Sequence, residues 1–280
     1  MRRPAPRAKK SLGQHFLVDL SVIDTIISAL ELKPGEPVLE IGSGRGVLTR
    51  ALVDAGAQVT AVELDAELIP ELEHLPIRVI HADILKIDPG EAAHASSRTP
   101  PDYKVAGNIP YYISSPILRH LLEAQPQPEL VVLMLQRELA ERVVAEPGDM
   151  SLLSVSVQVY GRPRIVRIVP ATAFRPPPKV ASAVLRIEVY PRPAVPLADP
   201  EQFFATVRAG FAERRKQVHN ALQRNYKPAG AHTRATFAPE DVARILDTAG
   251  IDPLRRAETL TLQEWSAVAD GLRGLGSPPG

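Results

Sequence analysis

The sequence predicts an α/β protein: a doubly wound, mostly parallel Rossmann-like sheet followed by a small all-helical C-terminal domain. Between residues 21 and 160, short runs that are apolar along their whole length alternate with amphipathic segments. Such runs are typical of parallel strands that helices cover on both faces. After a proline-spaced stretch at 190–200, the patterns are helical only. This order of elements indicates two domains of different class.

The first five strands are predicted from apolar runs, and two helical segments lie between them. The strand-like runs are PVLEIG (37–42), QVTAVEL (58–64), IRVIHADI (77–84), YKVAGNI (103–109) and ELVVLMLQ (129–136), and the helical segments are VLTRALVDAG (47–56) and AELIPELEHL (66–75). Further runs at LLSVSVQVYG (152–161), RIVRIVP (164–170) and SAVLRIEVY (182–190) predict antiparallel strands that complete the sheet. Residues 89–101 read as an exposed loop.

The stretch YPRPAVPLADP (190–200) reads as a semi-rigid linker, so we expect domains at 1–192 and 193–280. The predicted helices of the second domain are EQFFATVRAGFAERRKQVHNALQRN (201–225), APEDVARILDTAG (238–250) and TLQEWSAVADGLRG (261–274). Asp199 or Glu201 helps to start the first helix, and Pro239 starts the second.

The composition excludes several kinds of protein. The 280 residues contain no cysteine, which rules out disulfides, thiolate catalysis and cysteine-based zinc sites. The seven histidines show no metal-ligand spacing, so we expect no metal. No run of eighteen apolar residues exists, and no apolar segment follows the basic N-terminus, so we expect no membrane span or secretory signal and a cytoplasmic location.

The charge is segregated along the chain. Segments 1–20, 161–192 and 201–228 together carry a net charge of +14, while the whole chain carries +1. Basic faces are common on soluble proteins. The net charge of the whole chain is close to zero, so three such segments favour a surface on which positive and negative residues are separated. A protein that binds a polyanion requires such a surface.

A glycine-rich loop directly follows the first predicted strand, in VLEIGSGRGVLTRAL (38–52). Glycine lets the backbone turn sharply and approach a ligand closely. The spacing is G-x-G-x-G, and Glu40 stands two residues before Gly42. Glu63 ends the next strand, where an acid can accept hydrogen bonds from ribose hydroxyls. A nicotinamide dinucleotide enzyme and an S-adenosylmethionine enzyme both fit these features.

Further polar residues end the third and fourth strands. Asp83, in HADIL, can accept from an adenine amino group, and Asn108 and Tyr111 follow YKVAG in NIPYYISSPIL. By itself, N-I-P-Y could be a proline turn in which the asparagine caps its own backbone. With the blocks KKSLGQHFLVD, EIGSGRGVLT, VELD, FRPPPKVASAVLRI, FAERRKQVHNAL and RRAETLTLQEW, however, nearly the whole chain resembles the S-adenosylmethionine-dependent ribosomal RNA adenine N6-dimethyltransferases of the KsgA type.

The resemblance implies a class I methyltransferase fold and S-adenosyl-L-methionine as cofactor. Matched position by position, it implies that the cofactor is held by Gly42, Glu63, Asp83 and Asn108, with His15 and Leu17 closing over it. Two positions depart from the family pattern. His15 stands where the family usually has asparagine, and Ala181 stands where it has aspartate. We expect His15 still to contribute to the site and assign no role to Ala181.

The resemblance also implies the chemistry. The side-chain oxygen of Asn108 and the carbonyl of Ile109 would each accept one N6–H of adenine, so that the nitrogen lone pair points at the methyl group. Tyr111 would stack on the target base, with Phe174 on its other face. Arg214, Arg215 and Lys216, expected on a helix, would contact phosphates, although a solvated basic face is the ordinary reading of such residues.

The implied reaction is dimethylation of N6 in two adjacent adenosines of a hairpin loop near the 3′ end of 16S ribosomal RNA. We expect the partner to be an immature small ribosomal subunit, and the enzyme to be a monomer. Two alternatives stay open: an Erm-type enzyme acting on large-subunit 23S RNA, and a non-catalytic ribosome-assembly or transcription factor on the same fold. The chain length and the terminal RRAETLTLQEW favour the first reading over the Erm type.

Overall fold

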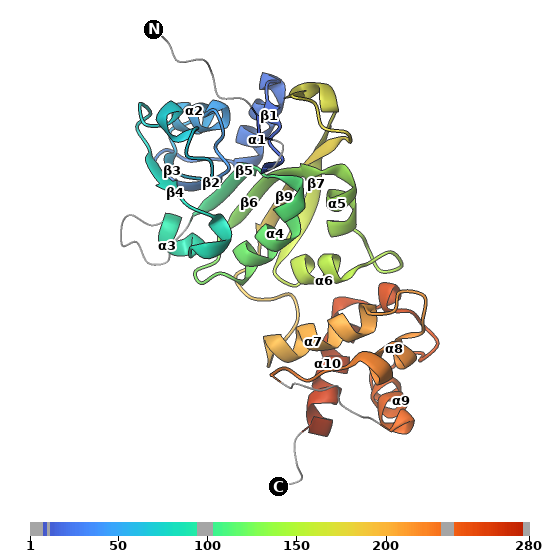
Figure 1. The fold of residues 1–280 in the computed structure, drawn as a ribbon. Helices are drawn as coiled ribbons and strands as arrows, with labels where there is room; N and C mark the ends of the chain where they lie inside the picture. Colours follow the sequence, from blue (N-terminus) through green and yellow to red (C-terminus); the bar gives the residue numbers. More distant parts are fainter. Residues whose placement is uncertain (1–7, 10–11, 94–102, 231–237, 277–280) are drawn as a thin grey trace. The chain divides into compact units, whose positions relative to one another are not determined.

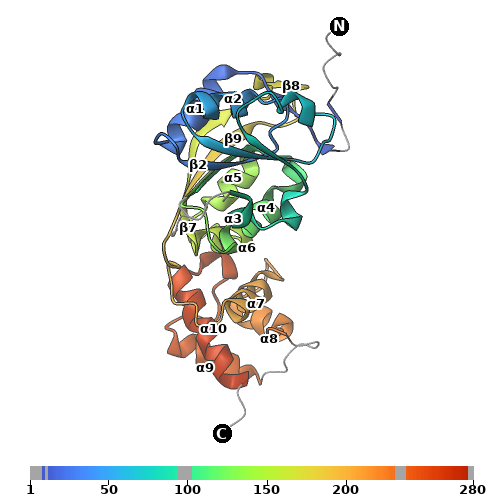
Figure 2. The ribbon, with the colours of Figure 1, turned by 90° about the vertical axis from the view of Figure 1, so that its left-hand side faces the viewer.

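The computed structural model describes residues 8–9, 12–93, 103–230 and 238–276. The chain forms two compact units (Figures 1 and 2). Unit 1 contains residues 1–141 and 162–191, and unit 2 contains residues 142–161 and 192–280. The sequence placed all of 1–192 in one domain, whereas the structure groups 142–161 with the C-terminal residues.

Unit 1 is built on a seven-stranded sheet of order β4-β3-β2-β5-β6-β9-β7. The strands are β2 Pro37–Ile41, β3 Gln58–Glu63, β4 Arg78–His81, β5 Lys104–Asn108, β6 Leu130–Gln136, β7 Gly161–Val169 and β9 Ser182–Val189. Strands β4, β3, β2, β5 and β6 pair in parallel, and β9 pairs antiparallel to β6. A separate two-stranded ladder joins β1 Phe16–Leu17 to β8 Phe174–Arg175. The predicted fold class is confirmed.

Helices cover both faces of this sheet, as Figures 1 and 2 show. Helices α1 Leu20–Leu30 and α2 Val47–Asp54 pack on one face, where Ile26 and Leu52 join Val38, Ala106 and Val132 in a buried cluster. Helices α3 Pro89–Ala93 and α4 Ser114–Glu123 lie on the other face. Short 3₁₀ turns occur at η2 Ile69–Glu71, η3 Ile84–Lys86, η4 Tyr111–Ile113 and η5 Ala171–Ala173, and α5 Arg137–Val143 follows β6.

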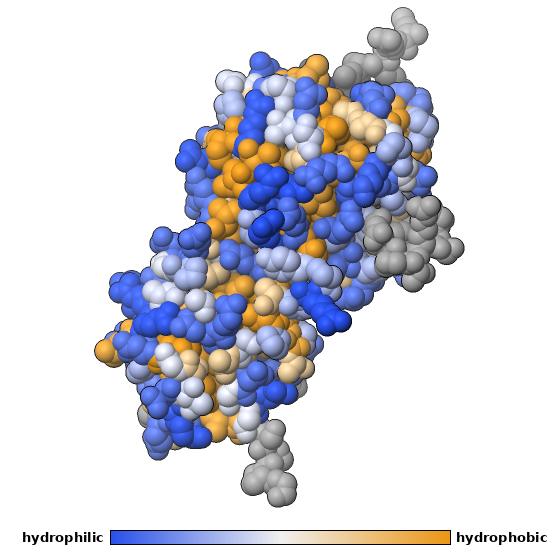
Figure 3. All heavy atoms as spheres, turned by 180° about the vertical axis from the view of Figure 1, so that it is seen from behind, coloured by the Kyte–Doolittle hydropathy of each residue, from blue (hydrophilic) through white to orange (hydrophobic). Residues whose placement is uncertain are grey.

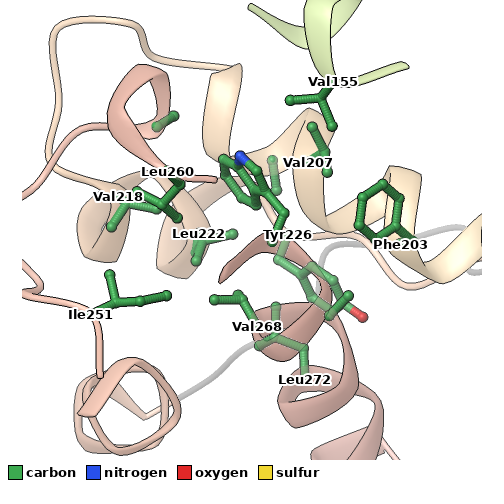
Figure 4. Packing of buried hydrophobic residues seen from close by; sticks show 14 of the residues in the cluster. Val155, Phe203, Val207, Val218, Leu222, Tyr226, Ile251, Leu260, Val268 and Leu272 are labelled. Atoms are coloured by element: carbon green, nitrogen blue, oxygen red, sulfur yellow. The ribbon is translucent and has the colours of Figure 1, made fainter. Parts of the chain in front are cut away.

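Unit 2 is helical. It contains α6 Leu152–Gln158, α7 Pro200–Phe211, α8 Val218–Asn225, α9 Pro239–Thr248, the 3₁₀ turn η6 Ala257–Thr259 and α10 Leu262–Gly276. As predicted, the Asp199 side chain caps the first of the C-terminal helices by accepting from the backbone N–H of Gln202. Figure 4 shows residues of α6, α7, α8 and α10 converging on one core, with Val155 of α6 directed toward Val207 and Phe203 of α7.

Helix α6 replaces the strand predicted at 152–161. The alternation of Leu, Val and Ser in this run has the period of a strand, but Ser151 caps a helix and shares a capping box with Ser154. The serines of this run are hydrogen-bonded within the protein. Ser154 is fully buried and donates to the carbonyl of Arg142, and Ser156 donates to the carbonyl of Leu152 one turn earlier. Serines satisfied in this way allow an alternating sequence to form a buried helix.

Other predicted elements also differ. The helix expected at 66–75 is reduced to η2, with Pro70 inside the turn. The single helix expected at 201–225 is broken between α7 and α8 at residues 212–217. The loop expected at 89–101 begins with α3, and 94–102 lies outside the described residues.

No helix in the described ranges is long and apolar enough to cross a membrane. On the face shown in Figure 3, hydrophobic residues lie in patches among predominantly hydrophilic ones. Large apolar side chains that are exposed include Val18 and Leu20, two positions apart, and Leu254 in unit 2. Exposed apolar residues are ordinary on protein surfaces.

Candidate functional site

The carboxyl ends of β2, β3, β4 and β5 meet at one edge of the sheet, and a pocket lies there. In an open parallel sheet this edge is where ligands bind. The pocket is lined by most of the residues that the sequence singled out: His15, Leu17, Gly42, Glu63, Asp83, Asn108, Ile109 and Tyr111. These residues come from five separate segments of the chain, so the fold itself assembles the site.

The glycine loop after β2 forms one wall of the pocket. Gly42 and Gly44 have φ angles of +70° and +56°, which residues with a side chain rarely adopt. A Cβ atom on Gly42 would face the backbone oxygen of Asn108 at 3.5 Å, and one on Gly44 would meet the ring of Phe16 at 3.4 Å. The loop therefore presents bare backbone, which allows a ligand to come close.

Glu63, at the end of β3, is held from both sides. Its Oε2 accepts from the backbone N–H of Gly44 at 2.8 Å, and its Oε1 accepts from that of Asp65 at 2.9 Å. The residue is only 6% exposed. Because each carboxylate oxygen has a second lone pair, Glu63 can still accept hydrogen bonds from two ligand hydroxyls in a fixed geometry.

Asp83, beyond β4, caps the 3₁₀ turn η3. Its Oδ1 accepts from the backbone N–H of Leu85 at 3.1 Å, whereas Oδ2 lies 4.0 Å from the ammonium of Lys86. The side chain is 30% exposed and lines the pocket. One carboxylate oxygen is thus used to shape the turn, and the other is available to accept from a ligand amine.

Glu40, to which the sequence analysis gave no role, is a buried acid in the pocket wall. The residue is 1% exposed, and its Oε2 has no hydrogen-bond partner among the described residues. Burial raises the pKa of this carboxyl to about 7; the hydroxyl of Thr49 opposes the rise, and the nearby charge of Glu63 adds to it. Its place two residues before Gly42 was the signal that could have identified it.

The N-terminal segment, residues 8–9 and 12–17, is tied to the pocket through Asp65. Lys9 Nζ contacts Asp65 Oδ1 at 2.7 Å, and Gln14 Nε2 donates to Asp65 Oδ2 at 2.9 Å. Burial favours protonation of Asp65, but the hydrogen bonds from Lys9 and Gln14 outweigh it, so the pKa of this carboxyl is below its ordinary value. Residues 12–17 line the pocket as a result.

The orientation of the Asn108 side chain is fixed by this segment. Its Nδ2 donates to the carbonyl oxygen of His15 at 2.9 Å. A carbonyl can only accept, so the NH₂ group must face His15 and the Oδ1 atom must face the other way. Asn108 therefore presents an acceptor at the pocket, rather than capping its own backbone.

Tyr111 stands next to Asn108 in η4. Its hydroxyl is 2.6 Å from that of Ser182, which is fully buried at the start of β9. Burial raises the pKa of the Tyr111 phenol, although the hydrogen bond with Ser182 opposes the rise. Ser182 was not selected from the sequence, even though it lies within the FRPPPKVASAVLRI block that was. The neighbouring Ala181 contributes its backbone oxygen, which accepts from the N–H of Arg137 at 3.0 Å.

Two expectations do not agree with the structure. Phe174, expected on the far face of the target base, is fully buried in the core of unit 1 and is not part of the pocket lining. In the pairing of β8 with β1, Phe174 lies opposite Leu17, which does line the pocket. Arg214, Arg215 and Lys216, expected on a helix, lie in the turn between α7 and α8, where all three are exposed.

The residues in the pocket suit S-adenosylmethionine. The bare glycine loop admits a close ligand, Glu63 can accept from ribose hydroxyls and Asp83 from an adenine amine. The Oε2 atom of Glu40 has no hydrogen-bond partner among the described residues. Because a buried carboxylate is costly without a partner, this atom is suited to pair with the positive charge of the cofactor. Within the part of the chain that the structure describes, no group of three or more acidic or histidine side chains could hold a metal ion.

A family model described as "Ribosomal RNA adenine dimethylase" matches residues 5–267 of the chain. A "Ribosomal RNA small subunit methyltransferase A" from Dehalococcoides mccartyi is 44% identical, over 94% of this chain and 87% of that protein. A protein of the same name from Pelotomaculum thermopropionicum is 40% identical, over 99% of this chain and 95% of that one.

Two solved structures resemble the chain over most of its length. A dimethyladenosine transferase from Plasmodium falciparum matches with a TM-score of 0.76 and 26% identity, over 94% of this chain and 98% of that one. The 23S rRNA methyltransferase ErmE matches with a TM-score of 0.66 and 30% identity, over 92% and 99% of the two chains.

Proposed function

The chain belongs to the ribosomal RNA adenine dimethylase family, and from this premise we propose that it dimethylates N6 of adenosines in small-subunit ribosomal RNA with S-adenosylmethionine. The observation that carries the proposal is the orientation of Asn108, whose amide N–H₂ is held by the His15 carbonyl and whose oxygen is left for the substrate. The amide oxygen can accept a hydrogen bond from an exocyclic amine, and the aromatic ring beside it can stack on the base that carries the amine.

When bound, the cofactor supplies an electrophilic methyl group on a sulfonium. The residues of the chain position the two reactants. Glu63 and Asp83 hold the cofactor through its ribose and its adenine, and Gly42 lets the backbone approach it. Glu40 offers a buried carboxylate for the cationic part. Holding two reactants in line accounts for the largest part of such a rate enhancement.

The adenine N6 amine is a poor nucleophile because its lone pair is delocalised into the ring. We assign to Asn108 Oδ1 and the Ile109 carbonyl the role of accepting the two N6 hydrogens, which directs the lone pair toward the methyl group. Tyr111 stacks on the base, and the Ser182 hydroxyl keeps its ring in place. The proton leaves after the attack, because a methylated ammonium of this kind is strongly acidic.

We further propose that the targets are two adjacent adenosines in a hairpin loop near the 3′ end of 16S ribosomal RNA, presented in an immature small subunit. Arg214, Arg215 and Lys216 are assigned to its phosphates, since all three are exposed in one turn. Because the substrate is ribosomal RNA, we expect the enzyme to act in the cytoplasm. We also expect it to be a monomer.

A second candidate is methylation of large-subunit RNA, which the likeness to ErmE favours. The relatives named as small-subunit enzymes are more similar to this chain in sequence, and this supports the first reading. Pocket residues suited to the cofactor speak against the non-catalytic alternative.

The test is to offer labelled S-adenosylmethionine with unmethylated small and large subunits and to map the modified nucleotide. We expect two labelled adenosines near the 3′ end of the small-subunit RNA. Label only in the large subunit would replace the proposal by the second candidate. Label in neither subunit would favour the non-catalytic alternative, in which the protein only binds RNA.

A further inference from the structure

The pocket at the carboxyl edge of the sheet is lined by several acids and by few bases. Glu40, Glu63 and Asp83 all line it, and Arg45 is the one lysine or arginine among its described lining residues. Carboxylates repel an anionic group that comes close to them unless a cation lies beside it. Among the described side chains of the pocket, Arg45 is therefore the natural partner for an anionic group of a ligand.

Arg45 belongs to the glycine loop after β2, and both its side chain and its backbone are held by the protein. The guanidinium carbon lies 4.5 Å from the centroid of the Phe16 ring, which also lines the pocket. A cation at this distance from the face of a ring is attracted to it. The backbone carbonyl of Arg45 accepts from Nη1 of Arg50 at 3.2 Å, and the preceding Gly44 donates its N–H to Glu63. Because the guanidinium is positioned in this way, less entropy is lost when it binds a ligand.

The order of the strands determines where each part of the cofactor lies along the edge of the sheet. Asp83 follows β4, Glu63 ends β3 and Asn108 ends β5, in a sheet of order β4-β3-β2-β5. With the adenine at Asp83, the ribose at Glu63 and the methyl group directed toward Asn108, the sulfonium lies over the end of β2. The methionyl chain starts at this sulfur. It therefore begins beside the loop that follows β2, which is the loop that carries Arg45.

The amino-acid end of the methionyl chain carries an α-ammonium and an α-carboxylate on one carbon. Glu40, buried in β2 two residues before the loop, is suited to the positive charge of the cofactor. Arg45, in the loop itself, supplies the charge that a carboxylate requires. A guanidinium can offer two parallel N–H donors to one carboxylate, which the ammonium of a lysine cannot do.

We propose that Arg45 binds the α-carboxylate of S-adenosylmethionine, so that the pocket selects ligands that carry the complete amino-acid end. The inference rests on the proposed function, in that the cofactor is S-adenosylmethionine. The residues assigned above hold the adenine, the ribose and the positive charge, and none of them holds the carboxylate. Anchoring the far end of the methionyl chain also helps to fix the sulfur from which the methyl group leaves.

The experiment measures by calorimetry how the full chain binds three ligands in the absence of RNA. The ligands are S-adenosylmethionine, decarboxylated S-adenosylmethionine, which lacks only the carboxylate, and S-adenosylhomocysteine, which keeps the carboxylate and lacks the methyl group. Arg45→Met and Arg45→Lys are compared with the parent. Arg119→Met, at an exposed arginine of α4 outside the pocket lining, is the control for the loss of one positive charge.

We expect Arg45→Met to weaken the binding of the two ligands that carry the carboxylate about ten- to 150-fold, the range for a charged hydrogen bond at 1.4 kcal/mol per tenfold. The Kd of the decarboxylated ligand should stay the same or fall. This ligand has no group for Arg45 to bind, and removing a positive charge from the pocket favours a cationic ligand. Arg45→Lys should lie between the parent and Arg45→Met, and Arg119→Met should match the parent for all three ligands.

Equal weakening of all three ligands by Arg45→Met would overturn the inference, because Arg45 would then only support the loop. Binding of S-adenosylmethionine at the parental affinity would overturn it as well. If circular dichroism shows that Arg45→Met is unfolded, Arg45→Lys decides. A loss confined to the two carboxylate ligands supports the inference, and equal losses or none contradict it.

The same measurements separate this inference from the proposed function. If the parent binds S-adenosylmethionine but methylates neither ribosomal subunit, the proposed function fails, while the comparison of the three ligands still decides the role of Arg45. A parent that binds none of the three ligands would overturn both.

Discussion

The side-chain nitrogen of Asn108 donates to the backbone carbonyl of His15 at 2.9 Å, joining the end of β5 to the N-terminal segment. One hydrogen bond therefore performs two tasks. It directs the Asn108 oxygen into the pocket, and it holds the segment that carries His15 and Leu17 against the site. Loss of this bond should affect methyl transfer more than the binding of RNA, which we assign in part to basic residues of unit 2.

Replacing Asn108 by alanine removes the N6–H acceptor and releases the His15 carbonyl. We expect the methyl-transfer step to slow about a hundred- to a thousandfold, the usual cost of removing one transition-state hydrogen bond of about 3–4 kcal/mol. Single-turnover assays measure the step directly. Gln58→Ala, at an exposed amide outside the pocket lining, is the control. Transfer at the parental rate would mean that Asn108 only shapes the turn.

Replacing Glu63 by alanine removes the acceptor for the ribose hydroxyls and leaves the N–H groups of Gly44 and Asp65 without a partner. Cofactor affinity should fall by about 1.5–3 kcal/mol, the range for charge-assisted hydrogen bonds. Calorimetry measures it, with the exposed Glu73→Ala as control. A folded variant that binds the cofactor as tightly as the parent would contradict the assignment.

The pocket residues at strand ends could be predicted from the sequence, because the position of an acid or asparagine after an apolar run fixes where the side chain must lie in a parallel sheet. Gly42, Glu63, Asp83 and Asn108 all lie in the pocket lining. In the same way, the apolar runs located strands β2 to β6, since burial on both faces leaves a clear local pattern.

What could not be predicted depends on interactions between residues far apart in the sequence. The partnership of Asp65 with Lys9 and Gln14 spans more than fifty positions, and that of Tyr111 with Ser182 spans 71. Helix α6 was read as a strand because the serine partners that stabilise the helix are not visible in an alternating pattern. The pairing of β8 with β1, which places Phe174 opposite Leu17, is likewise indicated by no local signal.

The stability of the cofactor-free protein should depend on the ionisation of Glu40. Its pKa is raised from 4.5 to about 7, so between these values the folded state binds more protons than the unfolded state. The contribution of Glu40 to stability therefore falls as pH rises from about 4.5 to 7, by about 3 kcal/mol in all if the full shift is realised. Glu40→Gln cannot ionise and should lack this part of the decline.

Denaturant unfolding of the parent and Glu40→Gln at several pH values between about 4.5 and 8 measures the difference. We expect the two free energies of unfolding to diverge in favour of the variant as the pH rises. Glu73→Gln, at an exposed position, should run parallel to the parent. Parallel curves for Glu40→Gln would show that this carboxyl is already paired when the cofactor is absent.

The hydroxyl of Tyr111 should matter as well as its ring, because it is hydrogen-bonded to Ser182. Tyr111→Phe leaves the fully buried Ser182 hydroxyl without its partner, at a cost of about 1–3 kcal/mol, and frees the ring to shift. Ser182→Ala alone should also slow methylation. The double variant should be no slower than the slower single one, because both remove the same bond. Additive losses would indicate that the two residues act separately.

Binding of the ribosomal particle should depend on the exposed turn between α7 and α8. Reversing the charges of Arg214, Arg215 and Lys216 together removes cations that neutralise phosphates, so affinity should fall and its dependence on salt should flatten by about one in slope for each phosphate that is no longer neutralised. Cofactor affinity should not change, since none of the three residues lines the pocket.

Filter binding at several salt concentrations measures the slope of affinity against salt. Reversal of Arg119, Arg244 and Arg273, exposed in α4, α9 and α10, changes the total charge equally and is the control. It should alter the slope less because these guanidinium groups already pair with Glu123, Asp241 and Asp270. An equal change in both variants would mean that the particle responds to the net charge of the protein and that the turn is not a specific RNA-binding site.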